Sequence, residues 1–336
     1  MGSFSISGRV CWALLLGQGV SLCLALAGFN TSLLASLGVD SPLAQSCFSY
    51  FSLASVYGAI LLYRRHKLQV SWYWYIPVAF LDMHSNFLLN KAYQFSSITS
   101  ITLLVCWTIP WGIILTRMFL GTRYSILQLV GSAVCVIGLA LVLLSDAESD
   151  DGGGGSMPLL GDGLVVVSTI FYASSNVSQE FILKDGGLVE EVLSMLGVFG
   201  FLFSLVELFA FELEGLASVN WSAEMTWAIT GYTLSFFSLY SMAPYVLKLS
   251  GATMLNLSSL TCDMWAVVIR IFFYHQKVDW LYFLAFAVVL LGLVMYSRNE
   301  KDPVPGHDLD SESSRQRLLA EPNPEAIAGN DSVPLT

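Results

Sequence analysis

Long apolar runs follow one another along almost the whole chain, separated by short stretches that hold charged residues, glycine and proline. Each run has roughly the 20 residues that an α-helix needs to cross a bilayer, and in lipid the backbone must satisfy its hydrogen bonds within the helix. The pattern predicts an all-α membrane protein with ten transmembrane helices, the first tilted or broken. The runs are 10–37, 42–63, 72–95, 98–119, 125–145, 161–183, 188–211, 222–247, 252–274 and 279–297.

The second half of the chain echoes the first. Residues 97–145 resemble residues 251–299 without a gap, at a constant offset of 154 (251 minus 97), so that Trp111 falls on Trp265. A membrane protein that repeats itself is typically a transporter, because two similar halves can alternate between two arrangements. Five runs in each half make the second copy enter the membrane from the opposite side. We therefore expect an inverted five-plus-five repeat.

Composition divides the chain into four parts. The glycine run at 152–155 is typical of a flexible linker, and the last segment, rich in Pro, Ser, Glu and Asp, predicts disorder. The expected parts are 1–145 as the first five-helix repeat, 146–160 as a Gly-rich luminal or extracellular linker, 161–298 as the second five-helix repeat, and 299–336 as a disordered cytosolic tail.

Composition and charge exclude several classes of protein. The chain is 55% hydrophobic and 12% charged, about half the charge of a soluble protein. Much of the net charge of −10 lies in one acidic loop and the tail, which excludes a nucleic-acid partner. The six cysteines lie inside apolar runs without metal-ligand spacing, and no catalytic motif is found. We expect no metal, no cofactor and no enzyme activity.

The distribution of Lys and Arg predicts the orientation. Basic residues gather in the loops on one side, and the positive-inside rule then puts both termini in the cytosol. The first apolar run begins close to the N-terminus, so we expect it to be retained as a signal anchor. The organelle stays open between the Golgi or endomembrane system, the vacuole and the plasma membrane.

Polar residues recur on one face of three predicted helices, and such residues usually face a cavity or a neighbouring helix. Serine and threonine more often join helices, and Lys91, Lys248 and Arg270 near helix ends could instead extend to the membrane surface. Glu207 is interpreted as interfacial. The predicted substrate-binding residues are Asn86, Asn90, Tyr93, Thr99, Tyr172, Asn176, Gln179, Tyr240 and Asn256. The predicted coupling or charged residues are Asp82, Lys91, Glu180, Lys248, Asp263 and Arg270.

Two segments carry a family resemblance. The stretch from Asn86 to Ser100 (NFLLNKAYQFSSITS) resembles the third-to-fourth helix region of the F branch of the solute-carrier-35 family, and SGATMLNLS at 250–258 resembles its ninth helix. The similarity covers roughly 10–298, and plant members look most similar. It implies the ten-helix inverted repeat of the drug/metabolite transporter superfamily. His84 and Val105 stand where members often have acidic residues, so a role of those acids is not carried over.

The leading hypothesis is a secondary transporter that moves a small polar organic solute through the bilayer by alternating access, with Asp263 or Glu180 coupling a proton. One alternative is a Golgi nucleotide-sugar exchanger, which would need Lys91, Lys248 and Arg270 for the diphosphate. Another is a non-transporting receptor or scaffold, whose polar faces would meet neighbouring helices. The expected partners are the substrate and the lipid bilayer, and a homodimer is left open.

Overall fold

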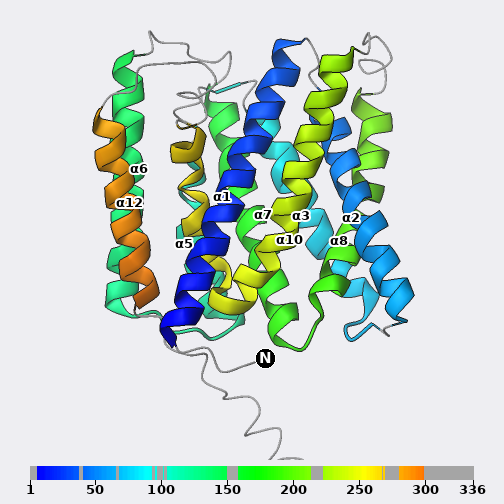
Figure 1. Cartoon of the computed structure of the whole chain (residues 1–336), viewed down its shortest axis with the longest axis horizontal. Coiled ribbons are helices and arrows are strands. Elements are labelled where there is room, and N and C mark those ends of the chain that lie inside the picture. The colour runs from blue at the N-terminus through cyan, green and yellow to red at the C-terminus, as the bar shows by residue number, and fades with distance from the viewer. Residues whose placement is uncertain are drawn as a thin grey trace, which may run out of the picture. The chain divides into compact units, whose positions relative to one another are not determined.

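Every regular element in the described parts of the chain is a helix (Figure 1). The structure, a computed structural model, describes residues 6–37, 41–65, 68–92, 95–96, 101, 104–149, 158–212, 222–266, 268 and 280–298. The chain divides into two units, Met1–Asn299 and Glu300–Thr336, and the second lies outside the described residues.

The α-helices are α1 (Ile6–Ser36), α2 (Pro42–Arg64), α3 (Tyr75–Ala92), α5 (Thr108–Phe119), α6 (Ile126–Ser149), α7 (Pro158–Lys184), α8 (Val189–Glu207), α10 (Ala223–Ser259) and α12 (Trp280–Arg298). The 3₁₀-helix η1 (Trp72–Trp74) leads into α3, and the π-helix η2 (Leu208–Glu212) continues α8. Among the described residues, three segments are long and apolar enough to cross a bilayer: Cys11–Leu34, Pro42–Arg64 and Val189–Glu212.

Some predicted helix boundaries are wrong. The first run is not broken, since α1 is continuous. The run 98–119 is not one helix, because α5 begins only after a turn at Cys106–Trp107. The runs 222–247 and 252–274 were expected as separate helices, and here the expected break is present: α10 is interrupted at Gly251, whose φ of 82° and ψ of 176° are not helical. Glycine lacks a Cβ and adopts this conformation without the steric cost that other residues meet.

Helix breaks recur at the spacing of the sequence repeat. The turn at Cys106–Trp107 has its counterpart at Leu260–Thr261, and α6 and α12 begin at Ile126 and Trp280. In each case the difference in residue number is 154, for example 260 minus 106 and 280 minus 126. One turn and one helix start therefore fall at equivalent places within the repeated stretches 97–145 and 251–299.

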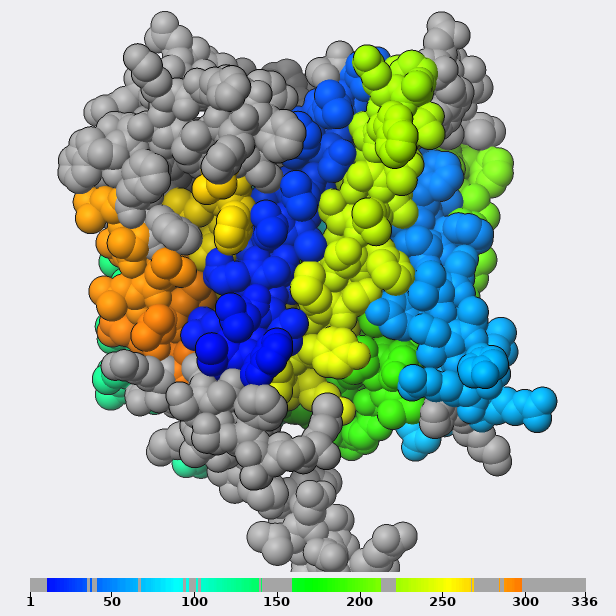
Figure 2. Space-filling model, in the orientation of Figure 1, coloured from blue at the N-terminus to red at the C-terminus, as the bar shows by residue number. Residues whose placement is uncertain are grey.

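Helix contacts also occur in equivalent pairs. Helix α1 packs along α10, side by side in Figure 2, and the corresponding pair of the other half, α7 and α3, is also in contact. Helices α2 and α8 pack together, as do α6 and α12. Two hydrogen bonds join residues 154 positions apart: the Cys135 thiol donates to the Val289 carbonyl oxygen at 3.4 Å, and Asn86 Nδ2 donates to the Tyr240 hydroxyl at 3.5 Å.

Glycines let α6 and α12 approach closely. A Cβ built on Gly131 would lie 2.9 Å from the carbonyl oxygen of Gly292, and one on Gly292 would lie 2.5 Å from the Cys135 sulfur. Both separations are shorter than real Cβ contacts. Membrane helices have little hydrophobic drive to associate with one another, and small residues allow the close packing that holds them together.

Replacing Gly292 by Val should therefore separate α6 from α12. We expect the loss of about 1–3 kcal/mol that is typical of overpacking, measured as a lower unfolding free energy in detergent micelles. Gly28 on α1 has nothing within 4 Å of a built Cβ, so Gly28→Val is the matched control. Equal stabilities of the two variants would contradict the close packing.

Candidate functional site

Asp82 is a carboxylate buried where four helices meet. It is 1% exposed, and its Oδ2 accepts hydrogen bonds from the hydroxyls of Tyr50 at 2.6 Å and Tyr240 at 2.5 Å. Its Oδ1 accepts a third from Ser175 at 3.1 Å. These donors come from α2, α10 and α7. Burying a carboxylate is costly unless donors surround it, so the three hydroxyls offset that cost and tie their helices to α3.

The next turn of α3 extends the polar face. Asn86 lies four residues after Asp82, on the same side of the helix, and its Nδ2 donates to the Asp82 carbonyl oxygen at 2.9 Å. The Ser85 carbonyl oxygen accepts a hydrogen bond from the Ser168 hydroxyl of α7 at 2.8 Å. Helix α3 therefore presents polar groups to α7 as well as to α10, through the Asn86–Tyr240 contact described above.

Asn176 of α7 and Asn256 of α10 form a second buried pair. Asn176 Nδ2 donates to Asn256 Oδ1 at 2.9 Å. The Nδ2 of Asn256 lies beside α5, only 3.0 Å from a Cβ built on Gly112, and it is buried without a hydrogen-bond partner among the described residues. The hydroxyl of Thr116, one turn further along α5, is also buried without a hydrogen-bond partner among the described residues. An unpaired buried polar group costs about 1–3 kcal/mol, so a ligand that paired with these groups would be stabilised here.

Helix α7 carries polar side chains between the two clusters. Gln179 Nε2 donates to the Ser175 hydroxyl at 3.1 Å, and that hydroxyl is the one that donates to Asp82. Tyr172 is half-buried and interacts with Asn176. The spacing of these residues along α7 places them on one face. One helix face therefore connects the Asp82 cluster to the Asn176–Asn256 pair.

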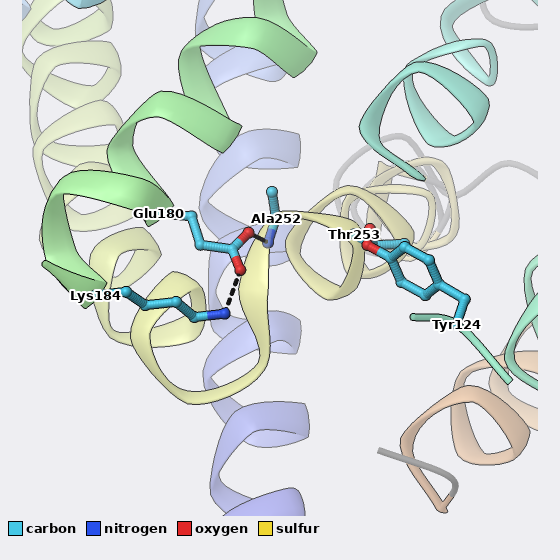
Figure 3. A network of polar contacts seen from close by, with 5 residues as sticks. All are labelled: Tyr124, Glu180, Lys184, Ala252 and Thr253. Carbon is cyan, nitrogen blue, oxygen red and sulfur yellow. Dashed lines mark hydrogen bonds and ion pairs between the residues drawn. The ribbon is translucent and has the colours of Figure 1, made fainter. Parts of the chain in front are cut away.

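A third polar cluster surrounds the bend of α10 (Figure 3). Glu180 is 1% exposed; its Oε2 accepts the backbone N–H of Ala252 at 2.6 Å, and its Oε1 lies 2.5 Å from the Lys184 ammonium nitrogen. Because Ala252 begins the helical segment after Gly251, the carboxylate meets the positive end of a helix dipole. On the same segment, the Thr253 hydroxyl lies 2.7 Å from that of Tyr124.

The structure distributes the predicted site residues over these clusters. Asp82, Asn86 and Tyr240 meet in the first, while Asn176 and Asn256 meet in the second, next to Gln179 and Tyr172. Glu180 belongs to the third. Asn90, Lys91 and Asp263 are half-buried, and Lys248 is exposed. Tyr93, Thr99 and Arg270 lie outside the described residues.

Sequence reasoning missed Tyr50, which is the lone polar group that α2 contributes to Asp82, and Thr116 on α5. It also did not find the partner of Glu207, whose Oε1 lies 2.7 Å from His84 Nε2 on α3. The Glu180–Lys184 ion pair has the i, i+4 spacing of a helix pair and was therefore visible in the sequence.

Comparison with known proteins decides the family. The family model described as "SLC35F: Solute carrier family 35" matches residues 7–298. The chain belongs to solute carrier family 35, in its F branch. Solute carrier family 35 member F2 of Mus musculus is 32% identical over 290 residues, covering 84% of this chain and 77% of that protein. Member F2 of Xenopus tropicalis is 34% identical over 293 residues, covering 84% and 75%.

Two further similarities agree with this membership. An uncharacterized solute carrier family 35 member of Schizosaccharomyces pombe is 31% identical over 304 residues, covering 87% of this chain and 59% of that protein. A crystal structure of a protein superimposes with a TM-score of 0.70 at 14% identity, covering 86% of this chain and 98% of that one, which supports the fold alone. Membership of the family makes the chain a multi-pass membrane protein of a solute-carrier class. That plant members are most similar stays a prediction.

The Asp82 cluster of this family member gives a stability prediction. Tyr240→Phe keeps the ring and removes a donor to a buried carboxylate, so we expect a loss of about 1–2 kcal/mol. The control is Tyr57→Phe: Tyr57 is on α2, and its hydroxyl donates to the neutral Ser241 hydroxyl of α10 at 2.7 Å. Unfolding in mixed micelles should show a larger loss for Tyr240→Phe. A larger loss for the control would refute the charge-assisted role.

The bend of α10 at Gly251 gives a second stability prediction. In Gly251→Ala the new Cβ would lie 2.7 Å from Glu180 Oε1, at a φ that is strained for alanine. We expect a loss of about 1–3 kcal/mol, seen as a lower thermal midpoint. Gly163→Ala on α7, which meets nothing within 4 Å, should leave the midpoint unchanged or raise it. If both alanine variants melt like the wild type, the bend does not depend on Gly251.

Proposed function

We propose that this family member is a secondary transporter of a small polar organic solute, working by alternating access of two five-helix halves, 1–145 and 161–298. The observation that carries the site is the buried amide nitrogen of Asn256, which has no partner among the described residues. A solute that offers an acceptor at this point would recover the hydrogen bond.

The sequence repeat and the helix contacts support the mechanism. Equivalent helix breaks occur 154 residues apart, and exchanging the halves maps the α1–α10 contact onto the α7–α3 contact. Cys135 and Val289 are equivalent in that repeat and in contact, and Asn86 and Tyr240 have the same offset just before it; in an inverted arrangement both pairs would lie near the axis that relates the halves. In such transporters the substrate binds at the interface of the repeats. This favours a site next to Asn86 and Tyr240.

The proposed binding residues combine two kinds of group. Asn86, Asn176, Gln179 and Asn256 would hydrogen-bond the solute, while the rings of Tyr172 and Tyr240 would stack on it. Asn90, Tyr93 and Thr99 complete the proposed set. Both termini are proposed to be cytosolic, with 146–160 as the linker on the opposite side and 299–336 as a disordered tail.

Glu180 is better suited to a gate than to proton coupling. Its carboxylate is already engaged by a lysine ammonium group and a helix-start N–H. This contact joins α7 to the bend of α10, and it would have to loosen when the halves rock. Asp263, which lies within electrostatic range of Cys106 at the break before α5, is kept as the candidate for proton coupling.

The nucleotide-sugar alternative gains no support from the described cations. A diphosphate requires basic groups that converge on it, whereas Lys184 is paired with Glu180 and Lys248 is exposed. Competition of uptake by nucleoside monophosphates would favour this alternative. A receptor or scaffold role would predict no transport by the reconstituted protein.

A ligand screen followed by uptake tests the proposal. Purified protein is screened by thermal shift against polar organic solutes. A ligand that binds only the folded protein raises the midpoint of thermal unfolding, and a tighter ligand raises it more at the same concentration. We expect the double variant Asn86→Ala/Asn256→Ala to fold but to lose both the shift and uptake into proteoliposomes. The control is Asn30→Ala, whose amide donates within its own helix to Leu26 O at 2.7 Å.

Normal uptake by the double variant would disprove the site. Uptake that is unchanged when the pH gradient is removed would disprove proton coupling while leaving the transport proposal intact.

A further inference from the structure

His84 and Glu207 form a titratable pair that the proposed transport mechanism does not use. His84 Nε2 on α3 lies 2.7 Å from Glu207 Oε1 at the end of α8. Their side chains are 19% and 16% exposed, so neither is freely solvated. The pair lies among the rings of Phe80 and Phe203: the centroids of Phe80 and His84 are 3.9 Å apart, and those of His84 and Phe203 are 6.3 Å apart.

The hydrogen bonds of His84 determine where a proton must be. Its Nδ1 lies 2.9 Å from the Phe80 carbonyl oxygen, one turn earlier on α3. A carbonyl oxygen can only accept, so Nδ1 carries a hydrogen and donates it. Nε2 then bears a hydrogen only when the imidazole is protonated. A neutral ring with this tautomer would turn a lone pair toward the carboxylate.

The short contact between Nε2 and Oε1 therefore requires one additional proton. It can reside on nitrogen, giving imidazolium and carboxylate, or on oxygen, giving imidazole and carboxylic acid; both forms are neutral overall. When the proton leaves, two acceptors face each other at 2.7 Å with a net charge of −1. That arrangement is repulsive, and the surrounding phenyl rings offer no donor of comparable strength to relieve it.

Several other titratable groups on the packed elements are engaged elsewhere. Asp82, on the opposite face of α3, is held by three hydroxyls, one of them from Tyr50 on α2. On η2, Glu212 accepts the backbone N–H of Leu43. On α7 the nearest titratable group to the Phe80–Phe171 contact is Tyr172, which interacts with Asn176, and on α10 Tyr240 is engaged by Asp82. Within the described residues, no other charged side chain is shown in contact with the pair.

We propose that His84 and Glu207 form a proton-binding site that links α3 to α8. With the proton bound, the hydrogen bond holds the two helices together; when the proton leaves to solvent, the contact breaks. The π-helix η2 begins at Leu208, directly after Glu207. Such wide turns are frequent at functional sites, and here the turn is adjacent to the residue that would move. Helix α3 carries Asp82 two residues before His84, so the pair acts on the helix that anchors the central cluster.

Nitrogen NMR on the reconstituted full chain tests the site without any substrate. The chain has four histidines, and replacing His66, His275 and His307 by Gln leaves His84 as the single labelled imidazole. We expect Nδ1 to stay protonated at every pH, while Nε2 loses its proton in one step as the pH rises. In Glu207→Gln the midpoint of this step should shift by about one pH unit or more, since one unit corresponds to about 1.4 kcal/mol of interaction.

The matched control is Glu190→Gln. Glu190 lies in the first turn of α8, and its Oε1 is 3.0 Å from a guanidinium nitrogen of Arg64, so the variant removes an ion pair of the same helix. It should leave the His84 midpoint unchanged. A deprotonated Nδ1, or an equal midpoint in Glu207→Gln and in the Glu190→Gln control, would overturn the proposal.

A second measurement uses the wild-type chain, so it does not depend on how the variants fold. Backbone hydrogen exchange of the 203–212 segment, corrected for the intrinsic pH dependence of exchange, should increase once Nε2 has lost its proton. If the protection of these backbone amides stayed constant across the titration, the proposed proton-dependent link between α3 and α8 would be contradicted. Because neither readout involves transport, a failed uptake assay would leave this site standing, and a failed titration would leave the transport proposal standing.

Discussion

The burial of the Asp82 carboxylate is the constraint on which the rest of the molecule depends. A charge cannot remain among apolar helices unless donors replace the water that it has lost. Tyr50, Tyr240 and Ser175 supply those donors from three different helices. One side chain thereby determines which faces of α2, α7 and α10 turn toward α3. The aromatic contacts of Tyr50 and Tyr240, whose centroids are 6.0 Å apart, follow from that arrangement.

The position of this cluster suggests how a rigid core and movable ends can coexist. Asn86 and Tyr240 are in contact and share the offset of 154, so in the proposed transport cycle we expect them to lie near the interface of the two halves and to move little. The Glu180–Ala252 contact joins residues that are not repeat equivalents, at the end of α7 and the bend of α10. A rocking motion would displace this contact more than the Asp82 cluster. The same reasoning separates a fixed binding site from its gate.

Much of the helical architecture could be predicted from the sequence, because membrane helices are recognised by the length and apolarity of their segments. The i, i+4 spacing of Asp82 and Asn86 placed both on one face, whereas the turns at Cys106–Trp107 and Leu260–Thr261, 154 residues apart, were not predicted. Contacts between residues far apart in the chain could not be predicted in this way. Nothing in the pattern around Asn176 and Asn256 indicates that the two amides are paired, because periodicity along one helix says nothing about its neighbour.

The failures have physical causes too. Glu207 was interpreted as interfacial from the acids near it, and its partner was missed because the carboxylate on α8 contacts His84 on another helix, α3. Tyr50 looked like one more aromatic residue in an apolar run. In each case the decisive partner came from another helix.

A structure of the protein trapped in a second conformation, determined in lipid nanodiscs by cryo-electron microscopy, would test the central claim most directly. We predict that Tyr50 and Tyr240 remain within hydrogen-bond distance of Asp82, while Glu180 and the N–H of Ala252 separate. A conformation in which the Asp82 cluster comes apart and the Glu180 contact persists would contradict a fixed centre with a gate at the bend of α10.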